Sequence, residues 1–279
     1  MNLDKLRLQI DQLDQKILRL LNERLTLAPV IGQKKKLVGG AIFAPDREEQ
    51  LLDRLLKSNR GPCEEKDLRA IYREIFSSSR ARQGGMTIGI PVDDIASFGV
   101  AQSVFGNQER YRGVEGLENG LSALEKKKID LLCIPMTVWL AAAEFSKNSE
   151  KLSKRLSLFS QIQPPVLGSH QQRSPLPPYW LITGKTVLTP TSEIRSGWFF
   201  FEGKPNPQSR AILQKFFQEE GWEPSIDRVI EYSNRQTWRC GVEWRKVLSL
   251  SEYKNRKLQL RKLKSFQSSV MIGSERNLG

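Results

Sequence analysis

Apolar residues recur every three or four positions through the first 37 residues. The stripe consists of Leu3, Leu6, Ile10, Leu13, Ile17, Leu20, Arg24, Leu27 and Ile31. Alternating steps of three and four are typical of one long amphipathic helix that buries its stripe against other helices. We therefore predict a helix from about Leu3 to about Leu37, ended by the glycines at 39 and 40.

Two more helices are expected before residue 85. One begins near Asp46, which we predict as its N-cap, with Glu49 three residues later as the capping-box partner. The other begins after Pro62 and continues to the glycine pair at 84 and 85. The pattern thus predicts an all-α domain of three helices over residues 1–84.

The pattern changes to short strands after residue 85. Residues 86–92 and 129–135 are predicted as buried strands with helices between them, and the Pro-, Ser- and Gln-rich stretch 158–179 as a connecting loop. From Tyr179 the order strand, helix, strand, strand, helix, strand indicates an α+β unit with a helix layer on an antiparallel sheet. We predict a multi-domain chain with boundaries 1–84, 85–183 and 184–279.

Composition narrows the possible functions. The 279 residues are 39% hydrophobic, without a secretory signal or a membrane-spanning apolar run. Three scattered cysteines without metal-ligand spacing suit the cytoplasm, and the single His170 argues against a histidine triad or metal site. The net charge of +13 is spread along the chain, which favours solubility and attraction of small acidic substrates. We expect neither a nucleic acid nor a membrane as partner.

Arg24 interrupts the apolar stripe. A guanidinium keeps its charge, so a buried one needs an anion, supplied either by a protein carboxylate such as Glu23 or by a ligand. Lys35 lies eleven residues later, about 20° off the same line and about 16 Å along the axis. Two long cationic side chains can therefore lean toward one site.

Further polar residues accompany these cations. Ser79 lies on the inward line of the third helix, Gln83 one turn later on the same side, and Arg47 and Glu48 open the second helix. A dianionic ligand accounts for the set: Arg24 and Arg47 can clamp carboxylates, with donors between them. Taken singly, Arg7 and Arg47 are more often solvated surface charges, and a serine such as Ser79 is usually a small packing residue.

Arg7 lies 28 residues before Lys35, which is about 42 Å along a straight helix. The two side chains of one chain cannot reach the same small molecule. If both serve one site, Arg7 must come from a second copy, and the sequence then predicts an obligate dimer with composite sites.

Residues 3–83 resemble the all-helical chorismate mutase family through LRLQIDQLDQKILRLLNERLTLAPVIGQKK, IFAPDREEQLL and GPCEEKDLRAIYREIFSSSRARQ. The family's substrate-binding positions fall on Arg7, Arg24, Lys35, Arg47, Glu48, Ser79 and Gln83. One position departs, where Ala44 stands in place of an Asp that some members have.

The resemblance implies an isomerase that converts chorismate to prephenate by a [3,3] rearrangement, without a cofactor or metal. It implies an intertwined homodimer through the N-terminal helices, with chorismate as the small-molecule substrate. The carboxylates would be held by Arg24 and by Arg7 of the partner subunit. Lys35 and Gln83 would face the ether oxygen, with Lys35, Gln83 and Arg24 as catalytic residues. Glu48 would accept from the ring hydroxyl, and Arg47 and Ser79 would complete the pocket.

The remaining order resembles the bifunctional proteins that join chorismate mutase to prephenate dehydratase and an ACT domain. The resemblance is carried by FGVAQSVFG, KKKIDLLCIP, YWLITGK, EYSNRQTWRCGVEW and LQLRKLKSFQSSVMIGS. Where the dehydratase family has Thr-Arg-Phe, this chain has Pro178-Tyr179-Trp180, and its second lobe is mostly missing between Trp139 and Tyr179. We expect a truncated α/β lobe without dehydratase activity.

The ACT-like segment also departs from its family. Glu231, Ser233 and Arg235 keep part of a Glu-Ser-Arg motif, but a glycine-rich helix entry has become residues 206–209, Asn-Pro-Gln-Ser. Feedback binding of phenylalanine or another amino acid therefore stays open. Two rival functions remain for the chain: a bifunctional mutase and dehydratase, and a non-catalytic scaffold or regulator of aromatic amino acid (phenylalanine/tyrosine) biosynthesis.

Overall fold

The computed structural model describes residues 2–37, 43–143, 145, 148, 156–162, 179–184, 193–222, 226–263, 266 and 268–274. Contacts divide the chain into two compact units. Unit 1 comprises residues 1–88 and 101–111, and unit 2 comprises residues 89–100 and 112–279. The three-part division predicted from the sequence stays a prediction.

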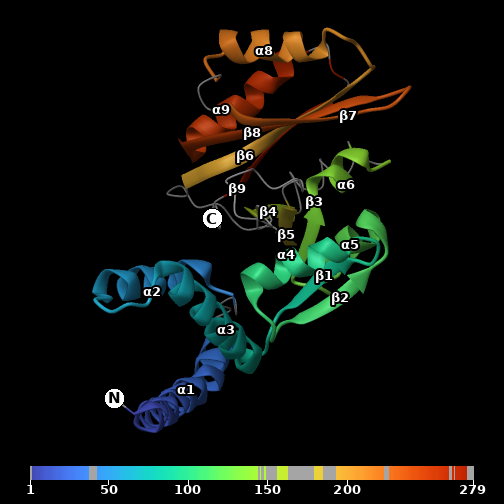
Figure 1. The fold of residues 1–279 in the computed structure, drawn as a ribbon. Coiled ribbons are helices and arrows are strands. Elements are labelled where there is room, and N and C mark those ends of the chain that lie inside the picture. The colour runs from blue at the N-terminus through green and yellow to red at the C-terminus, as the bar shows by residue number, and fades with distance from the viewer. Residues whose placement is uncertain are drawn as a thin grey trace. The chain divides into compact units, whose positions relative to one another are not determined.

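Three helices form most of unit 1 (Figure 1). Helix α1 spans Leu3–Leu37, as predicted, and continues through Pro29. Helix α2 spans Pro45–Ser58 with Ala44 as N-cap, so the predicted cap at Asp46 is wrong. Proline suits the first helical position because its missing N–H would have no partner there. Helix α3 spans Glu65–Gln83 and begins with a capping box that joins Glu64 and Asp67.

The apolar stripe of α1 is largely exposed in the single chain. Seven of its leucines and isoleucines are 46–60% exposed. The face of α1 that contacts α3 shares only Arg24 with the stripe. Its partly or fully buried residues are Leu21, Arg24, Leu25, Ala28, Gly32 and Lys35. Periodicity reveals an apolar face but not which molecule covers it, so burial of this stripe against other helices stays a prediction.

A five-stranded sheet follows, in the order β2-β1-β3-β5-β4. Its strands are β1 Thr87–Pro91, β2 Arg110–Val114, β3 Leu131–Pro135, β4 Leu156–Ile162 and β5 Tyr179–Gly184. Helices α4 Ile95–Phe105, α5 Gly116–Glu125 and α6 Met136–Ala141 lie between these strands in the sequence. Strand β4 pairs antiparallel with β5, so the predicted loop over 158–179 is wrong in its first part. Residues 163–178 lie outside the described part.

The C-terminal sheet has four antiparallel strands in the order β7-β8-β6-β9. They are β6 Glu193–Gly203, β7 Ile226–Ser233, β8 Trp238–Ser249 and β9 Ser268–Ser274. Helices α8 Ser209–Glu219 and α9 Leu250–Gln259, the latter followed by the 3₁₀ turn Leu260–Lys262, lie on the same side of this sheet (Figure 1). The predicted order of strands and helices is confirmed from Glu193 onward, whereas the strand at Tyr179–Gly184, predicted as part of this unit, pairs with β3 in the five-stranded sheet.

The aromatic run of β6 joins two cores because successive side chains of a strand point to opposite faces. Trp198 and Phe200 belong to a cluster with Trp139 and Trp180 of the five-stranded sheet region. Phe199, Phe201 and the aromatic residues of α8 form a second cluster. The C-terminal sheet thus buries both faces within unit 2. None of the described helices is long and apolar enough to cross a membrane.

Candidate active site

Arg24 meets α3 at Ser79. The guanidinium donates a short hydrogen bond to Ser79 Oγ, which in turn donates to the carbonyl oxygen of Ile75 at 2.8 Å. The guanidinium carbon also lies 5.7 Å from the centre of the Phe76 ring. No ion pair joins Arg24 to a carboxylate among the described residues, so its charge is solvated by a hydroxyl and an aromatic face rather than neutralised.

Gly32 allows α1 and α3 to approach closely beside Gln83. A Cβ at position 32 would lie 2.7 Å from the Gln83 carbonyl oxygen and 2.8 Å from its Cα. The Gln83 side-chain Oε1 is buried and has no hydrogen-bond partner within the described part of the chain. A buried acceptor without a partner is costly, so this oxygen can accept a hydrogen bond from a donor that enters the site.

The opposite charges of Lys35 on α1 and Glu48 on α2 interact. Burial lowers the pKa of the Lys35 ammonium below its usual value, although the Glu48 carboxylate opposes this. Burial raises the pKa of the Glu48 carboxyl, while Arg80 and Lys35 act against it. Burial also lowers the pKa of Arg24, again opposed by the Glu48 charge. Two cations and one anion therefore share a partly desolvated region.

Glu48 is held by Arg80, a residue that the sequence analysis did not select. Arg80 Nη1 donates to both Glu48 oxygens, at 2.6 and 2.7 Å. Arg80 Nε donates to Glu109 Oε1 at 2.6 Å, and Nη2 donates to the Phe105 carbonyl oxygen at 2.7 Å. The side chains of Arg80 and Glu109 are 3% and 0% exposed, whereas Glu48 is 23% exposed and remains accessible on one side.

Two predicted site residues stand apart in the single chain. Arg7 is exposed and forms an ion pair with Asp4 at 3.5 Å. Arg47 is exposed at the start of α2. One chain therefore gathers Arg24, Lys35, Glu48, Ser79 and Gln83 around the contact of α1 with α3, and leaves Arg7 and Arg47 at its surface.

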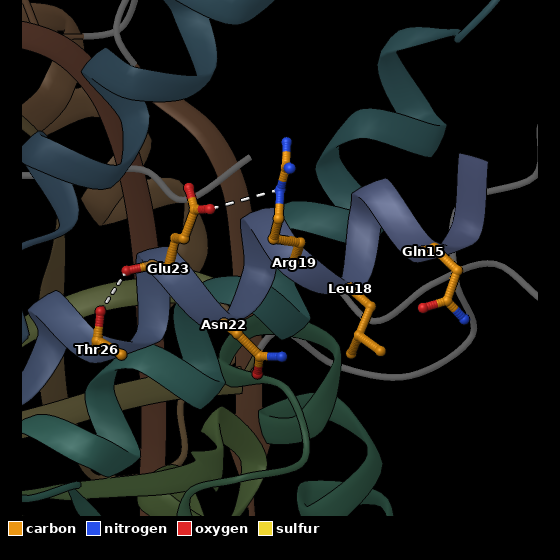
Figure 2. A pocket seen from close by; sticks show the side chains of 6 residues that line it. All are labelled: Gln15, Leu18, Arg19, Asn22, Glu23 and Thr26. Carbon is orange, nitrogen blue, oxygen red and sulfur yellow. Dashed lines mark hydrogen bonds and ion pairs between the residues drawn. The ribbon is translucent and has the colours of Figure 1, made fainter. Parts of the chain in front are cut away.

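A hollow of about 430 Å³ lies along α1, but it does not contain the predicted site. Figure 2 shows the residues that line it, which are Gln15, Leu18, Arg19, Asn22, Glu23 and Thr26. Arg19 Nε lies 3.6 Å from Glu23 Oε1, and Thr26 Oγ1 donates to the Glu23 carbonyl oxygen at 2.7 Å. All six side chains come from one helix, so no second wall surrounds a bound molecule.

Three residues of the site were missed by sequence reasoning. Arg80 lies one turn after the inward Phe76, which is a signal that was present but not used. Gly32 stands inside a helix, where glycine is unfavourable, and so marks a close approach. Glu109 carries no local signal, because only the fold brings it to Arg80.

The α/β region carries an acidic residue just before helix α4. Asp94 precedes α4, and its carboxylate accepts a hydrogen bond from Ser97 Oγ at 2.6 Å. It also accepts from the hydroxyl of the buried Tyr179, whose pKa is raised by burial and by this carboxylate. Trp180 is enclosed by Trp139, Trp198 and other aromatic rings.

The ACT-like part contains a cavity of about 210 Å³ between α8 and strands β7 and β8. Its walls are mostly apolar and include Leu213, Phe217 and the buried Cys240. Arg210 is a further lining residue, and its Nε lies 3.9 Å from Glu231 Oε1. Ser233 and Arg235, the other members of the predicted motif, are exposed.

The fold and the site define a three-helix domain with partly buried cations at the contact of α1 with α3. Residues 6–84 match the family described as chorismate mutase type II. This part of the chain is therefore a chorismate mutase type II domain, an isomerase domain, as the sequence predicted. The α/β region that follows makes the protein multi-domain.

Two curated relatives carry the same name, bifunctional chorismate mutase/prephenate dehydratase. The protein of Aquifex aeolicus (strain VF5) is 31% identical over 140 residues, which cover 48% of this chain and 38% of the relative. That of Neisseria gonorrhoeae (strain ATCC 700825 / FA 1090) is 30% identical over 128 residues, covering 46% and 35%. The matches therefore span well under half the length of these relatives, and they extend beyond residue 84.

Among solved structures, the prephenate dehydratase from Staphylococcus aureus subsp. aureus Mu50 is similar to this chain. It has a TM-score of 0.41 and 8% sequence identity, covering 67% of this chain and 98% of that one. A TM-score below 0.5 is too low to carry an argument about function.

Proposed function

We propose that this protein is a chorismate mutase that acts as a homodimer, and that it has lost prephenate dehydratase activity. The observation that carries the proposal is Arg24, a partly buried cation with no carboxylate partner among the described residues, with the Lys35 ammonium further along the same helix. Such a set suits a dianion. Three free cysteines agree with a cytoplasmic location.

The rearrangement needs positioning and charge stabilisation rather than a nucleophile. Arg24, already oriented by Ser79, holds one substrate carboxylate in fork geometry, and Arg7 of the partner subunit holds the other. Lys35 and Gln83 donate to the ether oxygen as negative charge grows there during C–O cleavage. Glu48 accepts from the ring hydroxyl, and Arg47 closes the pocket.

The homodimer rests on the apolar stripe of α1. Its members from Leu3 to Ile31 are about half exposed, and residues 3–20 contain no fully buried side chain. A second α1 packed along this stripe would remove it from water, which is favourable by about 25 cal/mol per Å². The same pairing carries Arg7 toward the distant end of its partner, as the separation of 42 Å requires.

The loss of dehydratase activity is supported by Asp94 and Tyr179. An anionic substrate at the start of α4 would be repelled by the Asp94 carboxylate, which Ser97 and Tyr179 already hold. Trp180, which stands where the dehydratase family has Phe, is packed into a buried cluster of apolar side chains. Incubating the protein with prephenate is expected to give no phenylpyruvate, and enzymatic production of phenylpyruvate would favour the bifunctional alternative.

The mutase proposal is tested by following the loss of chorismate absorbance. The wild-type protein is expected to be active, and Arg24→Ala to lower kcat/KM by about a hundredfold or more while staying folded. Arg19→Ala is the matched control, because it removes an exposed arginine from the same helix. A wild-type protein without activity would support the scaffold alternative instead.

The dimer is tested separately by sedimentation. Ile17→Glu places a charge in the middle of the exposed stripe and is expected to give inactive monomers. Lys16→Glu, next to it and away from the stripe, is expected to remain dimeric. A monomeric, fully active wild-type protein would refute the composite site.

A further inference from the structure

Residues 101–111 follow the helical domain in sequence but belong to the same compact unit. They lie against one side of α3 through hydrogen bonds to backbone atoms. Arg73 Nη1 donates to the Ser103 carbonyl oxygen at 3.2 Å, and Ser77 Oγ accepts from the Gln108 N–H at 2.9 Å. The side of α3 that carries Ser79 and Gln83 faces α1, so α3 is clamped between the two.

The contact is closely fitted at Gly106. Its φ of 76° is a conformation that favours glycine. A Cβ there would lie 2.7 Å from the Ser77 Cβ. The next residue, Asn107, donates its N–H to Glu74 Oε2 at 3.1 Å. A loop this specifically shaped to α3 is part of the domain rather than a linker after it.

The segment reaches the candidate active site through one side chain. Glu109 accepts from the Met86 N–H at 3.0 Å with Oε2 and from Arg80 with Oε1. Arg80, fixed also by the Phe105 carbonyl, donates to both oxygens of Glu48. A carboxylate has about four lone-pair sites, so Glu48 can still accept a hydrogen bond from a ligand hydroxyl.

We infer that Arg80 is a positioning residue for Glu48, and that residues 101–111, through Phe105 and Glu109, are a built-in part of the mutase site. The inference rests on the proposed function for its catalytic meaning. It gives part of the region after residue 84 a role in the mutase domain, namely to fix the guanidinium that orients the Glu48 carboxylate and keeps it ionised.

The charges that face Glu48 determine how this can be tested. Arg80 from α3, and Lys35 and Arg24 from α1, favour its ionised form, whereas Glu109 opposes it. Removing Arg80 should therefore raise the Glu48 pKa, and removing the Glu109 charge should lower it. A merely structural defect in both variants would not move the same titration in opposite directions.

The experiment titrates the full-length protein labelled with ¹³C at the glutamate side-chain carboxyl carbon. The Glu48 signal is assigned by its disappearance in Glu48→Gln. Arg80→Met is expected to raise its midpoint by about 1 pH unit or more, with Arg80→Lys returning it toward the wild-type value. Glu109→Gln is expected to lower it. Arg82→Met, an exposed charge on the same helix, is the control and should leave it unchanged.

The pH profile of kcat/KM for chorismate is measured in the same variants, and its acidic limb should follow the Glu48 midpoint. The inference is overturned if the Glu48 midpoint does not move in Glu109→Gln, or if it moves in the same direction in Arg80→Met and Glu109→Gln. If Arg80→Met does not fold, the result for Glu109→Gln alone decides. An acidic limb that ignores the midpoint overturns the positioning role. A wild-type protein without mutase activity refutes the proposed function, while the carboxyl titration still decides whether Arg80 governs Glu48.

Discussion

The substitution Gly32→Ala should lower catalytic activity much more than it lowers the stability of the fold. The added Cβ would lie 2.7 Å from the Gln83 carbonyl oxygen, whereas ordinary contacts begin at 3.4 Å. The backbones of α1 and α3 must therefore separate by about 0.7 Å, because the contacted Gln83 atoms belong to the backbone and not to a flexible side chain. Overpacking of this kind costs about 1–3 kcal/mol, and the better helix propensity of alanine returns about 1 kcal/mol. The expected net loss of stability is about 0–2 kcal/mol.

Activity should suffer more than stability in this variant. A misplacement of 1 Å in a positioned group can cost about a hundredfold in rate. Since Arg24 and Lys35 of α1 move relative to Ser79 and Gln83 of α3, we expect kcat/KM for chorismate to fall by roughly ten- to a hundredfold. Denaturant unfolding and the chorismate assay at one temperature measure the two effects together.

Gly61→Ala is the control, since its Cβ would meet only the Asn59 Oδ1 atom at 3.6 Å. It should leave kcat/KM unchanged. Full activity in Gly32→Ala would refute the reasoning, because it would mean that the close contact beside Gln83 does not determine the geometry of the site.

Three other predictions concern single side chains. Burial lowers the Lys35 pKa, and Lys35 must be protonated to stabilise the negative charge of the transition state. As pH rises, kcat/KM should therefore fall at a lower pH than an ordinary lysine would give. Lys35→Arg should abolish this decrease at high pH, and an unchanged decrease would contradict the prediction. Ser79→Ala removes the hydroxyl that orients Arg24 and should raise KM about tenfold in steady-state assays, with far-ultraviolet circular dichroism unchanged; an unchanged KM would argue against this orientation. Arg239→Leu removes a buried guanidinium that donates to Glu202 Oε1 and to the carbonyl oxygens of Leu140 and Ala142, and it should destabilise unit 2 by about 3–5 kcal/mol in denaturant unfolding; a loss under 1 kcal/mol would count against a structural role for these contacts.

Local pattern was sufficient for the helices and for most strands. The steps of three and four predicted α1 to its end residues. The continuous apolar run Trp198–Phe201 is typical of a strand that is buried on both faces. The pattern failed for β2 and β4, which are short or polar strands stabilised by their neighbours in the sheet, and the start of α2 was set by Pro45 rather than by an acidic cap.

The sequence by itself determined the length of α1, the order of the later elements and the set of residue types suited to a dianion, because these depend on spacing along the chain. Only the tertiary structure decided which face of α1 meets α3 and that Arg24 is met by Ser79 rather than by an acid. It alone brought Glu109 and Glu48 to Arg80, from which they lie 29 and 32 residues away in the sequence. Long-range pairing of charges has no period in the sequence, since it arises where loops and helices close on one another.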